Sequence, residues 1–406
     1  MRVPGYRLLA QALVREQAAA IFYLMGAPIL DAGKACAEAG IRMIDARHEQ
    51  AAAMMAHAYA RVLARPSVCM AASGPGVVNL ASGLANALID CAPVVALGGA
   101  APIADVGTGA FQEIDQLAVM RPVTNWSERV HEARRIPEYV HRAFAQALSG
   151  KPGPAYLDLP GDVLYQEVDD SSVEWADPPA DGLPPGPAAP AELVERAVAL
   201  LRQAKRPIVL AGSGAWWSHA AAELQCLVET TGIPFYATPP ARGLIAEDDA
   251  NCFPGARSMA FQQADVVLLV GSRLNYVLGF GRPPRFSAAA RFVRIDIDPQ
   301  EIGTGQRAGL GIVGDARTVL RQLCVALSGN GAVSSHAAWR RQLAAADAEH
   351  RQRQQTELES RQTPIHPLRL CKEVRDFIDR DAIVIADGQE ILHYSRQSVP
   401  SFVPGH

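Results

Sequence analysis

Two short stretches near the N-terminus hold side chains that could bind a polar ligand and move a proton. The first is Arg47-His48-Glu49-Gln50, and the second is Ser73-Gly74-Pro75-Gly76, with Asn79 shortly after it. A helix N-terminus favours the charged form of a carboxylate such as Glu49, whereas the Ala- and Met-rich segment that follows it disfavours that form by desolvation. Glu49 is therefore either a proton-transfer group or an ordinary first-turn residue.

Each stretch lies between a strand-like run and a helical segment. Residues 41–44 and 67–72 are apolar and strand-like, and the helical segments are 50–62 and 79–88. Ligands in open α/β sheets bind at the carboxyl ends of the strands. We therefore expect Glu49 and the turn at 73–76 to lie at one sheet edge.

Together with Gly109-Ala110-Phe111-Gln112-Glu113, these stretches resemble the pyrimidine-binding domain of thiamine-diphosphate-dependent enzymes. The acetohydroxyacid synthase and 2-hydroxyacyl-CoA lyase branches share this pattern, and the resemblance extends over almost the whole chain. It implies that Glu49 is catalytic and contacts the aminopyrimidine ring. Implied cofactor contacts are Glu49, Ser73, Gly74, Pro75, Gly76 and Asn79, and implied substrate contacts are Ala27, Pro28, Ile29, Phe111, Gln112 and Glu113. As plain turn or helix-capping residues, the last six would need no ligand.

Composition and charge are those of a globular enzyme with two or three domains. The 406 residues are 49% hydrophobic and 20% charged, with a net charge of −4 that does not favour nucleic acid or an anionic membrane surface. No apolar run is long enough for a membrane span, and no signal-peptide core is present at the N-terminus. The seven cysteines lack paired spacing, which favours reduced thiols and a cytoplasmic location.

Alternating strand-like and helical segments predict an α/β protein with two successive parallel-sheet, Rossmann-like domains and the start of a third. The predicted order is a pyrimidine-binding domain (1–165), a Pro-rich linker (166–190), a central nucleotide-binding-like domain (191–327), a helical connector (328–365) and the beginning of a diphosphate-binding domain (366–406).

The central domain carries a weak nucleotide-binding signal. Gly212-Ser213-Gly214 follows a strand, and Arg273, Asp296 and Asp298 stand at other strand ends. A cation suits phosphates and carboxylates suit ribose hydroxyls, which together favour an adenine nucleotide. The full candidate set is Gly212, Ser213, Gly214, Arg273, Asp296, Ile297, Asp298 and Asp315. The alternative is a domain that keeps nucleotide-fold geometry without a ligand.

The segments 238–243, 271–276 and 280–286 are similar to the central domain of 2-hydroxyacyl-CoA lyases and oxalyl-CoA decarboxylases. The pattern that acetohydroxyacid synthases associate with a bound flavin is missing, so the resemblance implies ADP, or the ADP end of coenzyme A. Arg242, Arg282 and Arg285 are candidates for contacts with coenzyme A phosphates, with exposed loop arginines as the alternative.

The C-terminal segment predicts a helix at 367–378 and a strand at 382–386. The resemblance implies that Gly388 and Gln389 then touch the cofactor diphosphate. The Gly-Asp-Gly motif that precedes the Mg²⁺ ligands in this family is not present, so no metal ligand is assigned in this chain. We therefore interpret the sequence as a piece of a longer enzyme whose remaining part holds Mg²⁺.

The implied function is a thiamine-diphosphate-dependent carbon–carbon lyase. It would cleave a 2-hydroxyacyl-CoA to an aldehyde or ketone plus formyl-CoA, or decarboxylate oxalyl-CoA. Acetohydroxyacid synthase is the alternative within the family, and a non-catalytic partner subunit is the alternative from another class. The resemblance also implies a homo-oligomer, dimer or tetramer, with the active site between subunits.

Overall fold

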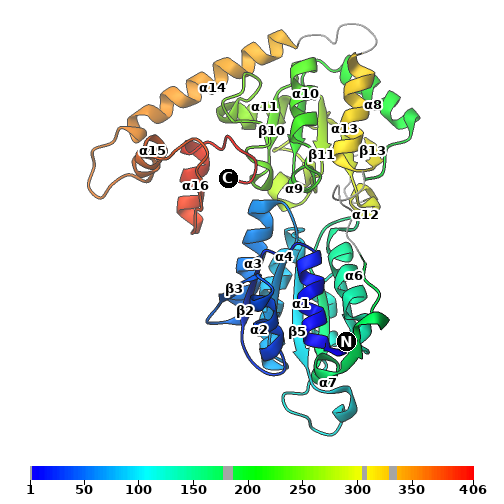
Figure 1. Cartoon of the computed structure of the whole chain (residues 1–406). Helices are drawn as coiled ribbons and strands as arrows, with labels where there is room; N and C mark the ends of the chain where they lie inside the picture. Colours follow the sequence, from blue (N-terminus) through cyan, green and yellow to red (C-terminus); the bar gives the residue numbers. More distant parts are fainter. Residues whose placement is uncertain (1, 177–185, 304–308, 329–335) are drawn as a thin grey trace. The chain divides into compact units, whose positions relative to one another are not determined.

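The computed structural model describes residues 2–176, 186–303, 309–328 and 336–406. These divide into two compact units, Met1–Pro184 and Pro185–His406 (Figure 1). Each unit is built on a parallel sheet with helices, which confirms the predicted fold class. Part of the predicted linker, 177–185, lies outside the described residues.

The first unit has a six-stranded sheet in the order β3-β2-β4-β5-β7-β6, with every neighbouring pair parallel. Its strands are β2 (Ala20–Leu24), β3 (Arg42–Asp45), β4 (Ser67–Ala71), β5 (Val94–Ala100), β6 (Trp126–Arg129) and β7 (Ala155–Pro160). Strands β3 and β4 confirm the strand-like runs predicted at 41–44 and 67–72. Strand β6 lies at the edge of the sheet and pairs only with β7.

Helices cover both faces of this sheet. They are α1 (Gly5–Arg15), α2 (Leu30–Glu38), α3 (Glu49–Leu63), α4 (Pro75–Ile89), α5 (Gln116–Met120), α6 (Ile136–Leu148) and α7 (Gly161–Tyr165). Successive side chains of a strand point to opposite faces. On β4, Val68 and Met70 join the core formed with α1, α2 and α6, whereas the Ser67 hydroxyl donates to the Ala56 carbonyl of α3 at 2.7 Å. Both faces are therefore buried, as parallel sheets require.

A short antiparallel pair ties the beginning of the first unit to its end. Strand β1 (Arg2–Pro4) pairs with β8 (Glu167–Asp169), in register from Arg2 opposite Asp169. This pairing carries the first unit beyond residue 165, where the sequence placed the boundary.

The second unit has a five-stranded parallel sheet in the order β10-β9-β11-β12-β13. Its strands are β9 (Pro207–Ala211), β10 (Phe235–Ala237), β11 (Val266–Val270), β12 (Arg291–Asp296) and β13 (Leu310–Val313). Its helices are α8 (Ala191–Gln203), α9 (Ser213–Trp217), α10 (Ala221–Thr231), α11 (Arg257–Gln263), α12 (Pro299–Gly303), α13 (Ala316–Ser328), α14 (Ala337–Leu358), α15 (Pro367–Phe377) and α16 (Gln389–Ser398).

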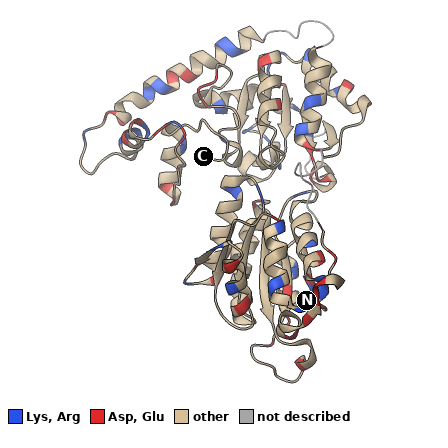
Figure 2. Ribbon diagram, viewed as in Figure 1, with Lys and Arg blue, Asp and Glu red and all other residues tan. Residues whose placement is uncertain are grey.

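Helix α14 joins the core of the second unit through its first turns only. Trp339 and Leu343 are buried in that core, and the Trp339 indole donates to the Pro207 carbonyl at 3.2 Å. Charged side chains of both signs lie along the rest of the helix (Figure 2). Within the described residues, no helix is both long and apolar enough to cross a membrane.

The predicted strand at 382–386 is wrong. Residues 382–387 have no regular secondary structure, and Ile385 is 89% exposed. A strand needs a hydrogen-bonded neighbour, and the described residues place none beside this segment. Its β-branched sequence alone does not make it a strand.

We therefore expect the amides of 382–386 to exchange with solvent at close to the unprotected rate, because they lack ladder hydrogen bonds. Hydrogen exchange followed by mass spectrometry measures this, with the amides of β4 as the slow internal control. Strong protection over 382–386 would contradict the exposed arrangement.

Candidate active site

Glu49 is the first residue of α3 and follows the carboxyl end of β3. The residue before it, His48, caps the helix, since its Nδ1 accepts a hydrogen bond from the Gln50 amide at 3.1 Å. The Glu49 side chain is only 8% exposed, and its Oε2 accepts a hydrogen bond from Asn79 Nδ2 at 2.9 Å. Capping therefore falls to His48, and the Glu49 carboxylate is held by α4.

The other carboxylate oxygen of Glu49 faces a space that Gly76 keeps open. A Cβ at position 76 would lie 3.2 Å from Oε1 of Glu49 and 3.4 Å from Cβ of Ala72. Glu49 Oε1 has no hydrogen-bond partner among the residues that the structure describes. This oxygen can therefore bond to a ligand, which fits the implied contact with a ring nitrogen.

Glu49 and Asn79 meet because helices α3 and α4 pack closely. Gly83 lies one turn after Asn79, and a Cβ at Gly83 would stand 2.6 Å from Cβ of Ala53. Any side chain there would push α4 away from α3 and lengthen the contact between Asn79 and Glu49.

The turn before α4 joins three segments that are distant in sequence. Gly74 has φ +62°, and a Cβ there would lie 2.4 Å from the Gln112 carbonyl oxygen, so only glycine fits. Ser73 Oγ contacts Gln112 Oε1 at 3.1 Å and the Ala27 carbonyl at 3.4 Å. The structure thus brings Ala27, the cofactor turn and Gln112 together, as the motifs imply.

Glu113 shapes the loop in which it lies. Its carboxylate accepts hydrogen bonds from the amides of Gly107 at 2.6 Å and Ala110 at 3.1 Å, and these bonds lower the pKa of Glu113. Neighbouring Phe111 is 73% exposed. Phe111 is therefore available to a ligand, whereas a substrate contact by Glu113 stays a prediction.

Gln116 was missed by sequence reasoning, although it follows the Phe-Gln-Glu motif closely. Its buried Nε2 donates to Asp158 Oδ1 at 2.6 Å and to the Gly99 carbonyl at 3.0 Å, while its Oε1 accepts from the Gly74 amide. Asp158 is fully buried and pairs with Arg129 Nε at 2.6 Å. Asp158 and the Gly99 carbonyl can only accept hydrogen bonds, and the Gly74 amide can only donate one. These partners therefore fix the orientation of the Gln116 side-chain amide. Gln116 therefore links a buried ion pair to the cofactor turn.

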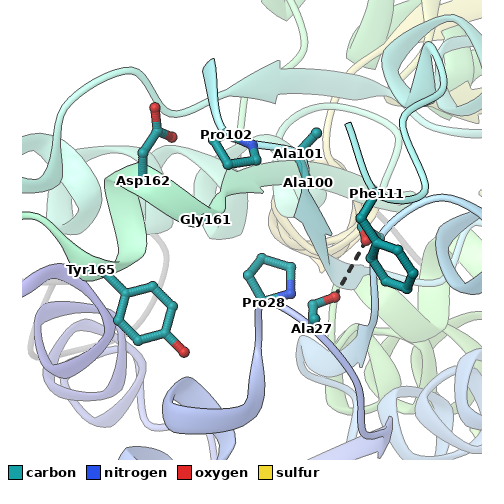
Figure 3. A pocket seen from close by; sticks show the side chains of 10 residues that line it. Ala27, Pro28, Ala100, Ala101, Pro102, Phe111, Gly161, Asp162 and Tyr165 are labelled. Atoms are coloured by element: carbon teal, nitrogen blue, oxygen red, sulfur yellow. Dashed lines mark hydrogen bonds between the residues drawn. The ribbon is translucent and has the colours of Figure 1, made fainter. Parts of the chain in front are cut away.

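A pocket of about 390 Å³ opens beside the Ser73 turn (Figure 3). Three predicted substrate residues, Ala27, Pro28 and Phe111, line it. A fourth, Ile29, is instead buried in the core beneath the loop. The remaining lining residues are Ser73, Ala100, Ala101, Pro102, Gly161, Asp162 and Tyr165.

The glycines of the predicted nucleotide loop let two turns of the second unit pack together. The Gly214 amide donates to the Gly271 carbonyl at 2.9 Å, and a Cβ at Gly212 would lie 2.5 Å from that same oxygen. Gly212 and Gly214 are thus required by packing whether or not a phosphate binds. Ser213 begins helix α9, and Arg273 is half-buried after β11.

The predicted nucleotide carboxylates also accept local backbone hydrogen bonds. Asp296 Oδ1 accepts from the Asp298 amide at 3.0 Å, and Asp298 Oδ1 accepts from the Gln300 amide at 2.8 Å. Asp315 Oδ1 accepts from the Thr318 amide at 2.8 Å at the start of α13. Ile297 lies in the bend between the first two. These residues stabilise turns, and their nucleotide role stays a prediction.

Gly388 and Gln389, the implied diphosphate contacts, stand at the N-terminus of α16. Gly388 has φ +110°, a conformation that favours glycine. Among the described residues, no group of three or more His, Cys, Asp or Glu side chains is arranged to hold a metal ion.

The Gln116 bonds generate a stability prediction. We expect Gln116→Leu to lower the free energy of unfolding by about 1–3 kcal/mol, because it leaves buried polar groups without partners, and to speed hydrogen exchange at the Gly74 amide. Urea unfolding and exchange measure the two effects. The control is Gln11→Leu on the exposed face of α1, expected within about 0.5 kcal/mol of the parent. Equal stability of the two variants would contradict the linking role.

Comparisons of the sequence with known proteins show which family the chain belongs to. Residues 4–119 match the N-terminal TPP binding domain of thiamine pyrophosphate enzymes, and residues 194–323 match their central domain. Mouse 2-hydroxyacyl-CoA lyase 1 is 31% identical over the whole chain, which covers 70% of that protein. An acetolactate synthase large subunit from Mycobacterium tuberculosis is 33% identical to this protein. The match spans 98% of this chain and 71% of the synthase subunit. Oxalyl-CoA decarboxylase from Escherichia coli is 29% identical to this protein. The match spans 98% of this chain and 71% of the decarboxylase. The chain belongs to the family of thiamine-diphosphate-dependent enzymes.

Proposed function

We propose that this protein is a thiamine-diphosphate-dependent carbon–carbon lyase acting on an acyl-CoA, of the 2-hydroxyacyl-CoA lyase or oxalyl-CoA decarboxylase type. The observation that carries the proposal is the placement of Glu49. Its carboxylate is nearly buried and fixed by Asn79, and Oε1 faces the space at Gly76. Relatives with both names match nearly the whole chain.

Residues of this chain would hold the pyrimidine end of the cofactor. When bound, thiamine diphosphate supplies a thiazolium carbon that adds to a carbonyl group and accepts the electrons of the broken bond. Glu49 Oε1 would bond to the aminopyrimidine ring nitrogen and exchange a proton with it. Asn79 keeps the carboxylate oriented at the N-terminus of α3. The turn at Ser73 and Gly74 would support the ring beside it.

Support for a coenzyme A substrate comes from arginines in the second unit. A cavity of about 1540 Å³ is lined by Arg242, Arg257, Arg285 and Arg396, among other residues. Burial, and then the neighbouring guanidinium groups of Arg285 and Arg396, lower the pKa of Arg257 to about 10. Arg285 and Arg396 form no hydrogen bond or ion pair within the described part of the chain. Such unpaired cations suit phosphate groups.

We also propose that the enzyme binds ADP and Mg²⁺ and associates with a second copy of the chain. ADP would bind near Arg273, Asp296 and Asp298, and Mg²⁺ would need oxygen ligands besides those described. Exposed apolar side chains on α3 and α4, such as Met54 and Val78, support self-association beside Glu49.

Acetohydroxyacid synthase is the second candidate, because a relative named acetolactate synthase is 33% identical. The missing flavin-associated segment after Arg273 favours the lyase type. A catalytically silent subunit is disfavoured, because Glu49 and its supporting residues are all present.

Glu49→Gln in the complete enzyme should slow proton exchange at the thiazolium carbon by about two to four orders of magnitude, the scale of positioned proton transfer. The amide keeps the shape of the side chain but cannot take up the proton. NMR of cofactor deuteration measures the rate, with Glu38→Gln on exposed α2 as the matched control. If Glu49→Gln exchanges as fast as Glu38→Gln, the proposed role of Glu49 fails.

Arg285→Gln should weaken coenzyme A binding about tenfold or more, since a charged hydrogen bond contributes about 1.5–3 kcal/mol. Titration calorimetry with free coenzyme A measures the dissociation constant. Arg206→Gln is the control, because Arg206 is exposed in the same unit but does not line the cavity. Parent-like affinity in Arg285→Gln would remove this support for an acyl-CoA substrate.

A further inference from the structure

We propose that the pocket beside the Ser73 turn binds the acyl chain of an aliphatic 2-hydroxyacyl-CoA and disfavours oxalyl-CoA. The inference rests on the proposed function and selects the lyase between its two reactions. It assigns Ala101, Asp162 and Tyr165, which the motifs did not identify, as residues that determine specificity.

The pocket is built by five segments at the carboxyl edge of the first sheet. Pro28 stands in the middle of Figure 3, with Phe111 on one side and Asp162 and Tyr165 of α7 on the other. Ala100, Ala101 and Pro102 follow from the end of β5. Ser73, which belongs to the predicted cofactor turn, also lines it. A chain bound here would therefore start next to the cofactor.

The lining suits an uncharged chain. Six of its ten residues are Ala, Pro or Phe, and none is Lys or Arg. Asp162 receives only backbone donors, the amides of Ala104 at 3.3 Å and Val163 at 3.0 Å. Burial, and then the neighbouring carboxylate of Asp31, raise the pKa of Tyr165, so its hydroxyl stays uncharged. The lining carboxylate of Asp162, with no lining cation to offset it, would repel the free carboxylate of an oxalyl group.

Size points to a short chain. At about 390 Å³ the pocket is near the lower end of the range for small-molecule sites. Pro28 fixes its floor because it packs onto Gly99, where a Cβ would lie 2.5 Å from the Pro28 ring. Ala100 at the end of β5 and Gly161 at the start of α7 are buried in the packed domain, so this side of the pocket is fixed.

The reaction needs no co-reactant beyond the substrate. The bond between the thioester carbonyl carbon and the hydroxyl-bearing carbon breaks, and the hydroxyl loses its proton as it becomes an aldehyde carbonyl. The bound cofactor would supply the group that accepts the electron pair, and this pair would then take up one proton to give formyl-CoA. Oxalyl-CoA would instead lose carbon dioxide and take up one proton to give the same product.

The test compares kcat/KM of the complete, cofactor-loaded enzyme for lactoyl-CoA, 2-hydroxyhexanoyl-CoA and oxalyl-CoA. We expect the parent to prefer the better 2-hydroxyacyl-CoA over oxalyl-CoA at least tenfold. Ala101→Leu, which adds three carbons to the pocket wall, should lower the hexanoyl value about tenfold more than the lactoyl value, the scale of a few methylenes in an apolar site. The control is Ala104→Leu, because Ala104 is exposed and outside the lining. It should leave the ratio of these two values unchanged.

Asp162→Asn provides a second test that does not depend on pocket size. It keeps an acceptor for one of the two amides and removes the charge, so the ratio of oxalyl-CoA to lactoyl-CoA turnover should rise at least severalfold. A preference of the parent for oxalyl-CoA, or equal losses for both chain lengths in Ala101→Leu, would overturn the pocket assignment and leave the proposed function intact. If no acyl-CoA is cleaved but pyruvate is converted to acetolactate, the proposed function fails and this inference fails with it.

Discussion

The hydrogen bond between Asn79 and Glu49 is the contact on which the rest of the site depends. It joins the first turns of two helices, α3 and α4, and fixes one oxygen of a nearly buried carboxylate. It forms because Gly83 lets the two helices approach, and Gly76 leaves the other carboxylate oxygen, Oε1, uncovered. The carboxylate is therefore nearly buried, oriented by one side-chain donor, and open to a ligand at its second oxygen.

The long elements of both sheets could be predicted because their pattern is local. The run of residues 67–72 and the Ala-rich segment after Glu49 are apolar over the length of a strand and a helix, and both predictions are confirmed. The strands β6, β10 and β13 were missed because each has only three or four residues and lies at the edge of its sheet. Strand β3 is equally short but was predicted because it leads directly into the Glu49 motif. The segment 382–386 failed for the opposite reason, since it has a strand's composition and no neighbouring strand.

The site divides in the same way. Glu49 and the glycine turn could be predicted because the chemistry requires particular residue types in consecutive positions. Gln116 could not, because its function is set by partners far away in sequence, at Gly74 and Asp158. Its only local signal was a glutamine next to a helix-capping aspartate, Asp115. Asp162 and Tyr165 were missed for a related reason, because no motif covers α7 and only the fold brings it beside Pro28.

Glycine carries different information in the two units. In the first unit, the missing side chain of Gly76 leaves Oε1 of Glu49 uncovered, so a ligand can reach this oxygen. In the second unit, the missing side chains of Gly212 and Gly271 let two backbone turns pack against each other, so the space is filled by the protein itself. The sequence pattern of a strand followed by Gly-x-Gly is the same for the ligand site and for the packing contact. What separates them is whether the space left by the missing Cβ borders a polar group without a partner, and by that criterion the first unit presents the better-defined ligand site.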